Sequence, residues 1–142
     1  MDKKVTIVGA GNVGATAAQR IFDNGFADVV LVDIVDGLAA GKALDMLESG
    51  PVINSDASII GTQDYNLTAG SDVVVITSGI ARKPGMSRDD LLLTNMKIIT
   101  SVVNEVAPRS PQAIILVVTN PLDAMAQKAL EVSHFDKKKV VG

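Results

Sequence analysis

The apolar run Val5–Val8 leads directly into three glycines, Gly9, Gly11 and Gly14, which have the spacing G-x-G-x-x-G. This pattern predicts a short buried strand, a glycine turn and the start of a helix. In such a unit the first glycine makes a tight turn, the second leaves the backbone open to close approach, and the third lets the helix pack near the sheet. The helix N-terminus adds free N–H groups and a partial positive charge. The stretch therefore predicts an α/β unit that can hold an anionic group; the alternative is a glycine-rich turn that binds nothing.

An acidic residue follows at the spacing that a dinucleotide site needs. Asp33 lies nineteen residues after Gly14, at the end of the apolar run Val29–Val32. At the carboxyl end of a strand, its carboxylate can accept hydrogen bonds from adenosine ribose hydroxyls and would repel a 2′-phosphate. The combination predicts a dinucleotide site that prefers NAD to NADP. The alternative is a surface turn acid, because Asp36 and Gly37 follow closely.

Predicted strands and helices alternate along the whole chain. Strands are expected at residues 5–8, 29–33, 57–61, 72–77 and 113–118, with another beginning at 139–142, and helices at 12–24, 37–47, 89–106 and 121–132. Gly50-Pro51 is expected to end the second helix, Pro108 to lie just past the third, and Asn120 to cap the fourth. The fold class is therefore α/β, a doubly wound parallel sheet of the Rossmann type. Residues 1–142 are expected to form one dinucleotide-binding domain, and the strand that begins at 139–142 indicates a piece of a longer protein.

The composition excludes several classes of function. The net charge is −3, aromatic residues make up 3% and tryptophan is absent, so the chain lacks the basic surface and stacking platforms that bind nucleic acid. It has no cysteine, which excludes disulfides and thiolate metal sites, and no metal is expected. The N-terminus lacks the apolar segment of a signal peptide, and no stretch is long enough to cross a bilayer. We therefore expect a cytoplasmic protein without a membrane or nucleic-acid partner.

Two arginines mark the loop that follows the strand at 72–77. Arg82 and Arg88 lie six residues apart around Pro84-Gly85. This loop leaves the carboxyl end of a central strand, the edge at which open α/β sheets bind ligands. Because a guanidinium pairs with a carboxylate as a rigid, charged fork, two of them suit a substrate with two carboxylates. A solvated basic loop is the alternative.

Other polar residues are expected near the same edge. Three of them follow the fourth strand and can line a cofactor groove: Thr77, Ser78 and Gly79. Asn95 and Asn120 each offer an amide donor and acceptor, although Asn95 could equally pack inside or face solvent. His134 is the only histidine, and its place at the end of the last helix predicts a helix-terminal role at the opposite edge. It is therefore no candidate for a base in hydride transfer.

Taken together, these motifs resemble the lactate/malate dehydrogenase family, and within it most closely the lactate-dehydrogenase-like malate dehydrogenases of bacteria. The matching motifs are Gly9–Gly14, Asp33, the Arg82–Arg88 loop and Val118-Thr119-Asn120-Pro121. They occur in the family's order and span the whole chain. The resemblance implies NAD as cofactor, malate and oxaloacetate as substrates, and a dimer or tetramer as the whole protein.

The resemblance also implies roles for individual residues. Those implied to contact NAD are Gly9, Ala10, Gly11, Asn12, Val13 and Gly14 at the pyrophosphate, Asp33 at the ribose, and Asn95, Val118, Thr119 and Asn120 at the nicotinamide half. Arg82 matches the position that binds the second carboxylate of malate, where lactate enzymes carry glutamine. Arg88 matches the catalytic arginine that polarises the substrate carbonyl oxygen, and Asn120 bonds the same oxygen. The Asn120-Pro121 peptide is implied to be cis.

In the family, three further groups lie in a second domain beyond the matched region. They are the histidine that transfers a proton, the acid that orients it, and the arginine that holds the first carboxylate. Arg82 and Arg88 therefore form half of a site. We expect the 142 residues alone to bind NAD weakly and not to turn over malate.

Other classes fit the sequence less well. A lactate or other 2-hydroxy-acid dehydrogenase would share the motifs and differ at the substrate. A non-catalytic nucleotide-binding module would share the glycines and Asp33 but does not need both arginines. Methyltransferases usually prefer G-x-G-x-G, whereas position 13 is Val13. Short-chain dehydrogenases need a tyrosine with a lysine four residues later, whereas Tyr65 is followed by Ala69.

Overall fold

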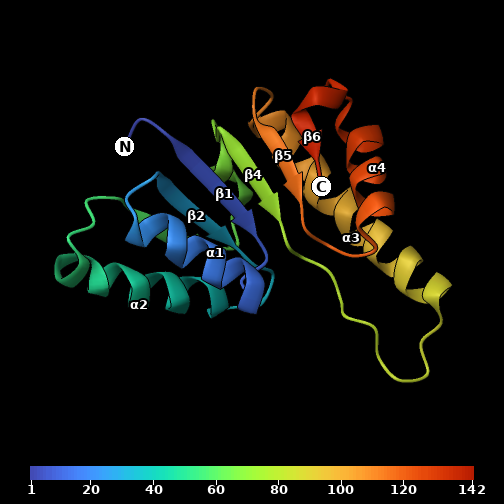
Figure 1. Ribbon diagram of the computed structural model, residues 1–142, viewed down its shortest axis with the longest axis horizontal. Coiled ribbons are helices and arrows are strands. Elements are labelled where there is room, and N and C mark those ends of the chain that lie inside the picture. Colours follow the sequence, from blue (N-terminus) through green and yellow to red (C-terminus); the bar gives the residue numbers. More distant parts are fainter.

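A parallel six-stranded sheet in the order β3-β2-β1-β4-β5-β6 forms the centre of the computed structural model, which describes residues 1–142 (Figure 1). The strands are β1 (Lys4–Val8), β2 (Asp28–Val32), β3 (Ile59–Thr62), β4 (Val73–Ile76), β5 (Ile114–Val117) and β6 (Val140–Val141). The chain builds β1, β2 and β3 outward in one direction and then returns to place β4 on the other side of β1. This reversal is the switch point at which doubly wound sheets bind ligands. The predicted fold class is confirmed.

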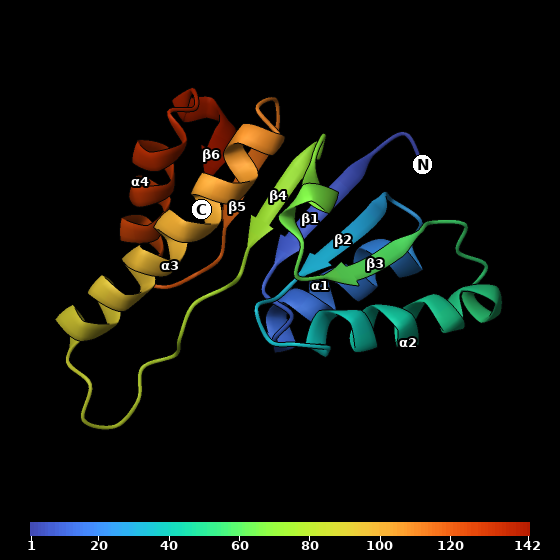
Figure 2. The same ribbon diagram turned by 180° about the vertical axis from the view of Figure 1, so that it is seen from behind.

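The helices cover both faces of the sheet. They are α1 (Asn12–Asp23), α2 (Leu38–Ile53), α3 (Arg88–Arg109) and α4 (Leu122–Ser133), with short 3₁₀ helices η1 (Tyr65–Thr68) and η2 (Lys137–Lys139). Helices α1 and α2 lie on one face and α3 and α4 on the other, as the two opposite views show (Figures 1 and 2). One buried cluster around Phe22 packs the first pair of helices, and another around Ile99 packs the second pair. Burial on both faces explains why the strands are almost continuously apolar.

Helix α2 runs to Ile53, so the prediction that Gly50-Pro51 ends it was wrong. A proline removes only the hydrogen bond that its missing N–H would make to the carbonyl of Leu47, and in a last turn that loss is small. Gly50 is buried against Phe22: a Cβ at this position would lie 3.3 Å from the ring, so the glycine lets the last turn of α2 pack closely on Phe22. The helix closes at Asn54, which adopts a left-handed conformation and donates its N–H to the carbonyl of Gly50.

Helix α3 also exceeds its predicted range at both ends. It begins at Arg88 because Ser87 and Asp90 form a capping box, with Asp90 N–H donating to Ser87 Oγ at 3.0 Å and Ser87 N–H to Asp90 Oδ2 at 3.1 Å. It ends at Arg109, with Pro108 inside the last turn rather than beyond it. The Ser-x-x-Asp spacing was the sequence signal for this helix start.

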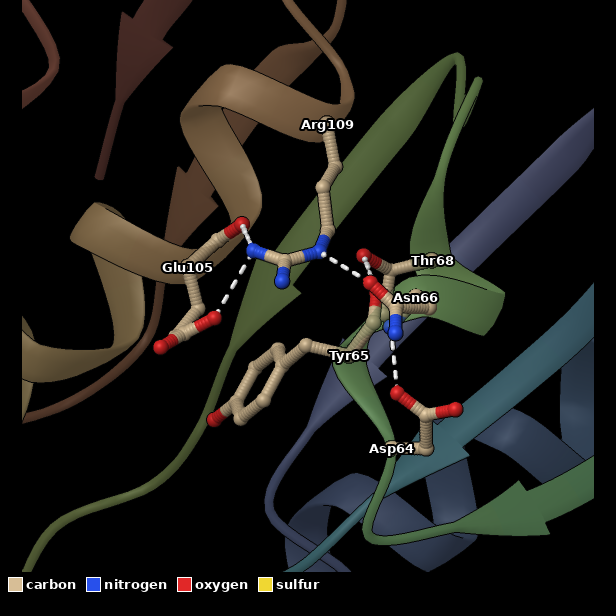
Figure 3. A network of polar contacts seen from close by, with 6 residues as sticks. All are labelled: Asp64, Tyr65, Asn66, Thr68, Glu105 and Arg109. Atoms are coloured by element: carbon tan, nitrogen blue, oxygen red, sulfur yellow. Dashed lines mark hydrogen bonds and ion pairs between the residues drawn. The ribbon is translucent and has the colours of Figure 1, made fainter.

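The C-terminal end of α3 is tied to η1 by a polar network (Figure 3). Arg109 Nη1 donates to the backbone carbonyl and to the Oε2 of Glu105, both at 2.7 Å, and Arg109 Nε donates to Asn66 Oδ1 at 3.2 Å. Tyr65 lies half-buried beside this network, and its burial, with the nearby negative charges of Glu105 and Asp33, raises the pKa of its phenol. The network therefore fixes η1 against α3.

Candidate functional site

Backbone hydrogen bonds that continue the sheet past the strand ends align four of the predicted site residues. Gly9 N–H donates to Val32 O at 2.8 Å, Thr77 N–H to Val8 O at 2.9 Å, and Val118 N–H to Ile76 O at 2.9 Å. The residue after Val32 is Asp33. The carboxyl ends of β2, β1, β4 and β5 thus place Asp33, Gly9, Thr77 and Val118 in one row at this edge.

The glycine turn has the close approaches that its spacing predicts. Gly9 has a φ of +110°, and a Cβ there would lie 2.8 Å from the backbone nitrogen of Ser78. A Cβ on Gly14 would overlap the carbonyl oxygen of Gly9, so α1 packs directly on the turn. By contrast, nothing lies within 4 Å of a Cβ on Gly11, and Gly11, Asn12 and Val13 are exposed. No side chain caps α1, which leaves its first N–H groups available to an anion.

The residue between the first two glycines, Ala10, is fully buried and held from both sides. Its N–H donates to Asp33 Oδ2 at 2.7 Å, and its carbonyl accepts from Lys42 Nζ at 2.6 Å. Asp33 Oδ1 also accepts from Val35 N–H at 2.9 Å. Asp33 therefore organises the glycine turn in addition to facing the edge. Lys42 was missed because its only signal in the sequence is a lysine on the second turn of an expected helix.

Asn95 is fully buried, so its side chain belongs to the interior of the domain rather than to an open surface. Its Oδ1 accepts from Ile80 N–H at 2.9 Å, and its Nδ2 donates to Ile80 O at 3.2 Å and Asn120 O at 2.7 Å. Thr119 adds a bond of 2.6 Å from its hydroxyl to the carbonyl of Ser78. These bonds lock the segment after β4 to the turn after β5.

Two hydroxyls lie where β4 ends. Thr77 Oγ1 donates to the carbonyls of Val8 and Gly9, each at 3.2 Å, and so links β4 to the glycine turn. Ser78 Oγ is buried and has no hydrogen-bond partner within the chain. A buried hydroxyl without a partner is unusual, which distinguishes Ser78 from the paired Thr77.

The turn after β5 corrects one prediction and confirms another. Asn120 does not cap α4, because Pro121 has an extended backbone and the helix starts at Leu122 without a side-chain cap. The Asn120-Pro121 peptide is cis, as the resemblance implied. The Asn120 side chain is exposed and makes no hydrogen bond within the chain, so its donor and acceptor remain available.

The two arginines of the loop remain free of carboxylate partners. Arg82 and Arg88 are exposed, and neither takes part in an ion pair. Arg82 Nε donates only to the carbonyl of Met86 at 3.3 Å, and Arg88 is the first residue of α3. The loop that carries them extends away from the sheet in both views (Figures 1 and 2). Two uncompensated positive charges therefore lie on the segment that joins β4 to α3.

His134 lies away from this edge. It follows α4 in a left-handed conformation with φ of 57° and is exposed. Because β6 is parallel to β5, the connection that holds His134 reaches the amino end of β6. His134 is therefore not a partner of the arginines.

Comparisons with known proteins identify the family of this domain. Residues 3–142 match the family described as lactate/malate dehydrogenase, NAD binding domain. The chain belongs to this family. It is 61% identical to the malate dehydrogenase of Thermomicrobium roseum, over 100% of this chain and 46% of that relative. The chain thus spans about half the length of the curated relatives that it matches.

Solved structures of malate dehydrogenases show the same fold. The apo enzyme of Picrophilus torridus superposes with a TM-score of 0.93 at 46% identity, covering 98% of this chain and 44% of that one. The enzyme of Archaeoglobus fulgidus in complex with NADH superposes with a TM-score of 0.91 at 40% identity, covering 96% and 47%. The cofactor of this domain family is NAD, as predicted. Within the domain, no helix has both the length and the apolar character needed to span a membrane.

Proposed function

We propose that these residues are the NAD-binding part of an NAD-dependent malate dehydrogenase, which interconverts malate and oxaloacetate. The observation that carries the proposal is the pair of uncompensated guanidinium groups, Arg82 and Arg88, on the segment between β4 and α3. The segment that carries both arginines leaves the sheet at the end of β4, next to the glycine turn. A dicarboxylate supplies the charges that such groups lack.

The residues present fit a dinucleotide. The open side of Gly11 and the uncapped start of α1 suit a pyrophosphate, and the half-buried carboxylate of Asp33 at the end of β2 suits a ribose. The proposed cofactor contacts comprise residues 9–14, Asp33, residues 77–79, Asn95 and residues 118–120. Asn95 is proposed to act indirectly, because it fixes the backbone of Ile80 and Asn120 rather than touching the cofactor itself.

In the proposed reaction, NAD would supply, when bound, the acceptor for the hydride that leaves C2 of malate, and NADH would supply the hydride for oxaloacetate in the reverse direction. Arg82 pairs with the carboxylate farther from C2, which aligns the substrate. Arg88 and the free Asn120 amide donate to the oxygen on C2 and stabilise the charge that develops there. The group that handles the hydroxyl proton is proposed to come from a second domain, together with an arginine for the other carboxylate.

The testing experiment follows NADH oxidation by the whole natural protein that contains these residues, with oxaloacetate and pyruvate compared at equal concentrations. The proposal expects a strong preference for oxaloacetate. A preference for pyruvate would support a dehydrogenase whose substrate is lactate or another 2-hydroxy acid instead of malate. Binding of NADH without oxidation in the presence of either substrate would instead favour a non-catalytic nucleotide-binding module.

We also propose that the whole protein acts in the cytoplasm as a homo-oligomer. Support for assembly comes from apolar side chains that α2 leaves exposed, including Leu44 at 56% and Leu47 at 44% exposure. Sedimentation of the whole protein tests this part, and a monomer at micromolar concentration would contradict it.

A further inference from the structure

We propose that Lys42 is a positioning residue for the dinucleotide: it holds the glycine turn in its binding conformation and contributes a positive charge that forms no ion pair within the domain. The inference rests on the proposed function, since it requires the dinucleotide pyrophosphate to lie on this turn.

No side chain within the glycine turn, residues 9–14, makes a hydrogen bond that could hold its shape. Three of its residues are glycines, and α1 starts without a side-chain cap. The restraint must therefore come from other elements. Both polar backbone groups of Ala10 are engaged by charged side chains, the N–H by Asp33 Oδ2 at 2.7 Å and the carbonyl by Lys42 Nζ at 2.6 Å. Hydrogen bonds to charged groups are shorter and stronger than neutral ones, so this pair restrains the peptide units on either side of Ala10.

The two restraints reach the turn from separate elements. Asp33 follows β2, whereas Lys42 projects from the second turn of α2 and is 32 residues from Ala10 in sequence. The Lys42 side chain is only partly exposed. Its stem therefore packs along the domain while its ammonium reaches the turn.

The charge of Lys42 is available to a ligand. None of the ion pairs in the domain includes it, so no carboxylate lies within 4 Å of its Nζ. An ammonium carries three donors, and Lys42 uses one of them on Ala10. The positive charge therefore adds to that of the α1 N-terminus, where an anionic pyrophosphate is favoured.

The test compares three variants of the whole protein: Lys42→Met, which removes donor and charge, Lys42→Gln, which replaces the ammonium by a neutral donor on a shorter side chain, and Lys42→Arg, which keeps both donor and charge. The control is Lys137→Met, because Lys137 is an exposed lysine of η2 with no hydrogen bond or ion pair. The dissociation constant of NADH is measured by the increase in NADH fluorescence, and the steady-state constants are measured with oxaloacetate.

We expect Lys42→Met to raise the dissociation constant of NADH about tenfold or more, Lys42→Gln to lie between it and the wild type, and Lys42→Arg to stay within about threefold of the wild type. At saturating NADH, kcat and the KM for oxaloacetate should change by less than about twofold, because the residue acts on cofactor binding alone. Lys137→Met should bind like the wild type. Binding of ADP, which carries a diphosphate, should weaken in parallel with NADH, and added salt should weaken NADH binding more in the wild type than in Lys42→Met.

Each contrary outcome has a distinct meaning. A wild-type protein that does not bind NADH would overturn the proposed function and this inference together. A wild type that binds NADH, alongside a folded Lys42→Met variant with an equal dissociation constant, would overturn the inference alone. If Lys42→Met does not fold, the comparison of Lys42→Gln with Lys42→Arg decides, and equal binding by these two overturns the role of the charge.

Discussion

The carboxylate of Asp33 accepts a hydrogen bond of 2.7 Å from the backbone N–H of Ala10, which joins the acid after β2 to the glycine turn after β1. A residue expected only to select the cofactor therefore also supports the turn on which the cofactor is proposed to lie. Both tasks use the same charge, so they should fail together when the charge is removed.

Replacing Asp33 by serine should weaken NADH binding and relax the discrimination against NADPH. The variant loses a charge-assisted bond to Ala10 and the repulsion of a 2′-phosphate, each on the order of 1.5–3 kcal/mol. We expect the ratio of kcat/KM for NADH over NADPH to fall about ten- to a hundredfold. Asp36→Ser is the matched control, because Asp36 is an exposed neighbour without a side-chain hydrogen bond. An unchanged ratio in Asp33→Ser would show that Asp33 does not face the ribose.

Replacing Arg82 by glutamine should shift the substrate preference from oxaloacetate toward pyruvate. The loss of a charge-assisted contact to the second carboxylate should cost on the order of 1.5–3 kcal/mol, about ten- to a hundredfold in kcat/KM for oxaloacetate. Competition assays with both substrates measure the change. Lys83→Gln removes the same charge from the neighbouring residue and should leave the ratio near that of the wild type. Equal effects of the two variants would show that Arg82 only adds to the overall positive charge that attracts an anionic substrate.

Alanine substitutions at two glycines should separate ligand contact from packing. Gly11→Ala places a methyl group where nothing lies within 4 Å, so the free energy of unfolding should change by less than about 1 kcal/mol. The methyl group should nevertheless raise the dissociation constant of NADH more than about tenfold, because it occupies the proposed approach of the pyrophosphate. Gly14→Ala instead overlaps the carbonyl of Gly9 and should destabilise the protein by about 2–4 kcal/mol. Urea unfolding and NADH titration measure the two effects. A Gly11→Ala variant that binds NADH as tightly as the wild type would contradict the proposed position of the pyrophosphate on the glycine turn.

Asn95→Ala should destabilise the protein and loosen the turn after β5. It leaves the N–H and carbonyl of Ile80 and the carbonyl of Asn120 without their partner, at a cost of about 2–4 kcal/mol. Asn104→Ala, at an exposed position of the same helix, is the control and should cost less than about 0.5 kcal/mol. Denaturation by urea measures both values. A change as small in Asn95→Ala as in the control would mean that water replaces the lost amide.

Acid should destabilise the domain partly through Asp72. Its pKa is lowered by the backbone N–H of Lys4, at 2.9 Å from Oδ2, and by the ammonium of Lys3, at 3.0 Å from Oδ1. Because the folded-state pKa lies below the unfolded value, this stabilisation is complete above the unfolded pKa near 4 and disappears as the pH falls through the folded pKa. The urea midpoint of Asp72→Asn should therefore decline less steeply between about pH 5 and pH 2 than that of the wild type. Parallel declines in the two proteins would assign the acid sensitivity to other groups.

Much of the fold follows from local patterns in the sequence. The apolar runs, the glycine spacing and the helical periodicities locate each strand and the start of each long helix to within a few residues, because hydrogen-bonding period and glycine stereochemistry act over short distances. The same patterns placed Asp33, Thr77 and Asn120 at strand ends, which a parallel sheet gathers at one edge, and Arg82 on the loop that leaves one of these strands. Helix ends were the weakest part, since Pro51 and Pro108 were expected to terminate helices and instead lie in their last turns.

Only the tertiary structure decided which polar groups are committed to the protein and which remain free. The bond from Lys42 to Ala10 and the bond from Asn95 to Asn120 join residues 32 and 25 positions apart. Such contacts depend on how helices sit on the sheet, and no local periodicity specifies them. The sequence by itself therefore determined the type of domain and the edge at which a ligand is proposed to bind, whereas packing determined how the glycine turn is held and which side chains keep free donors and acceptors.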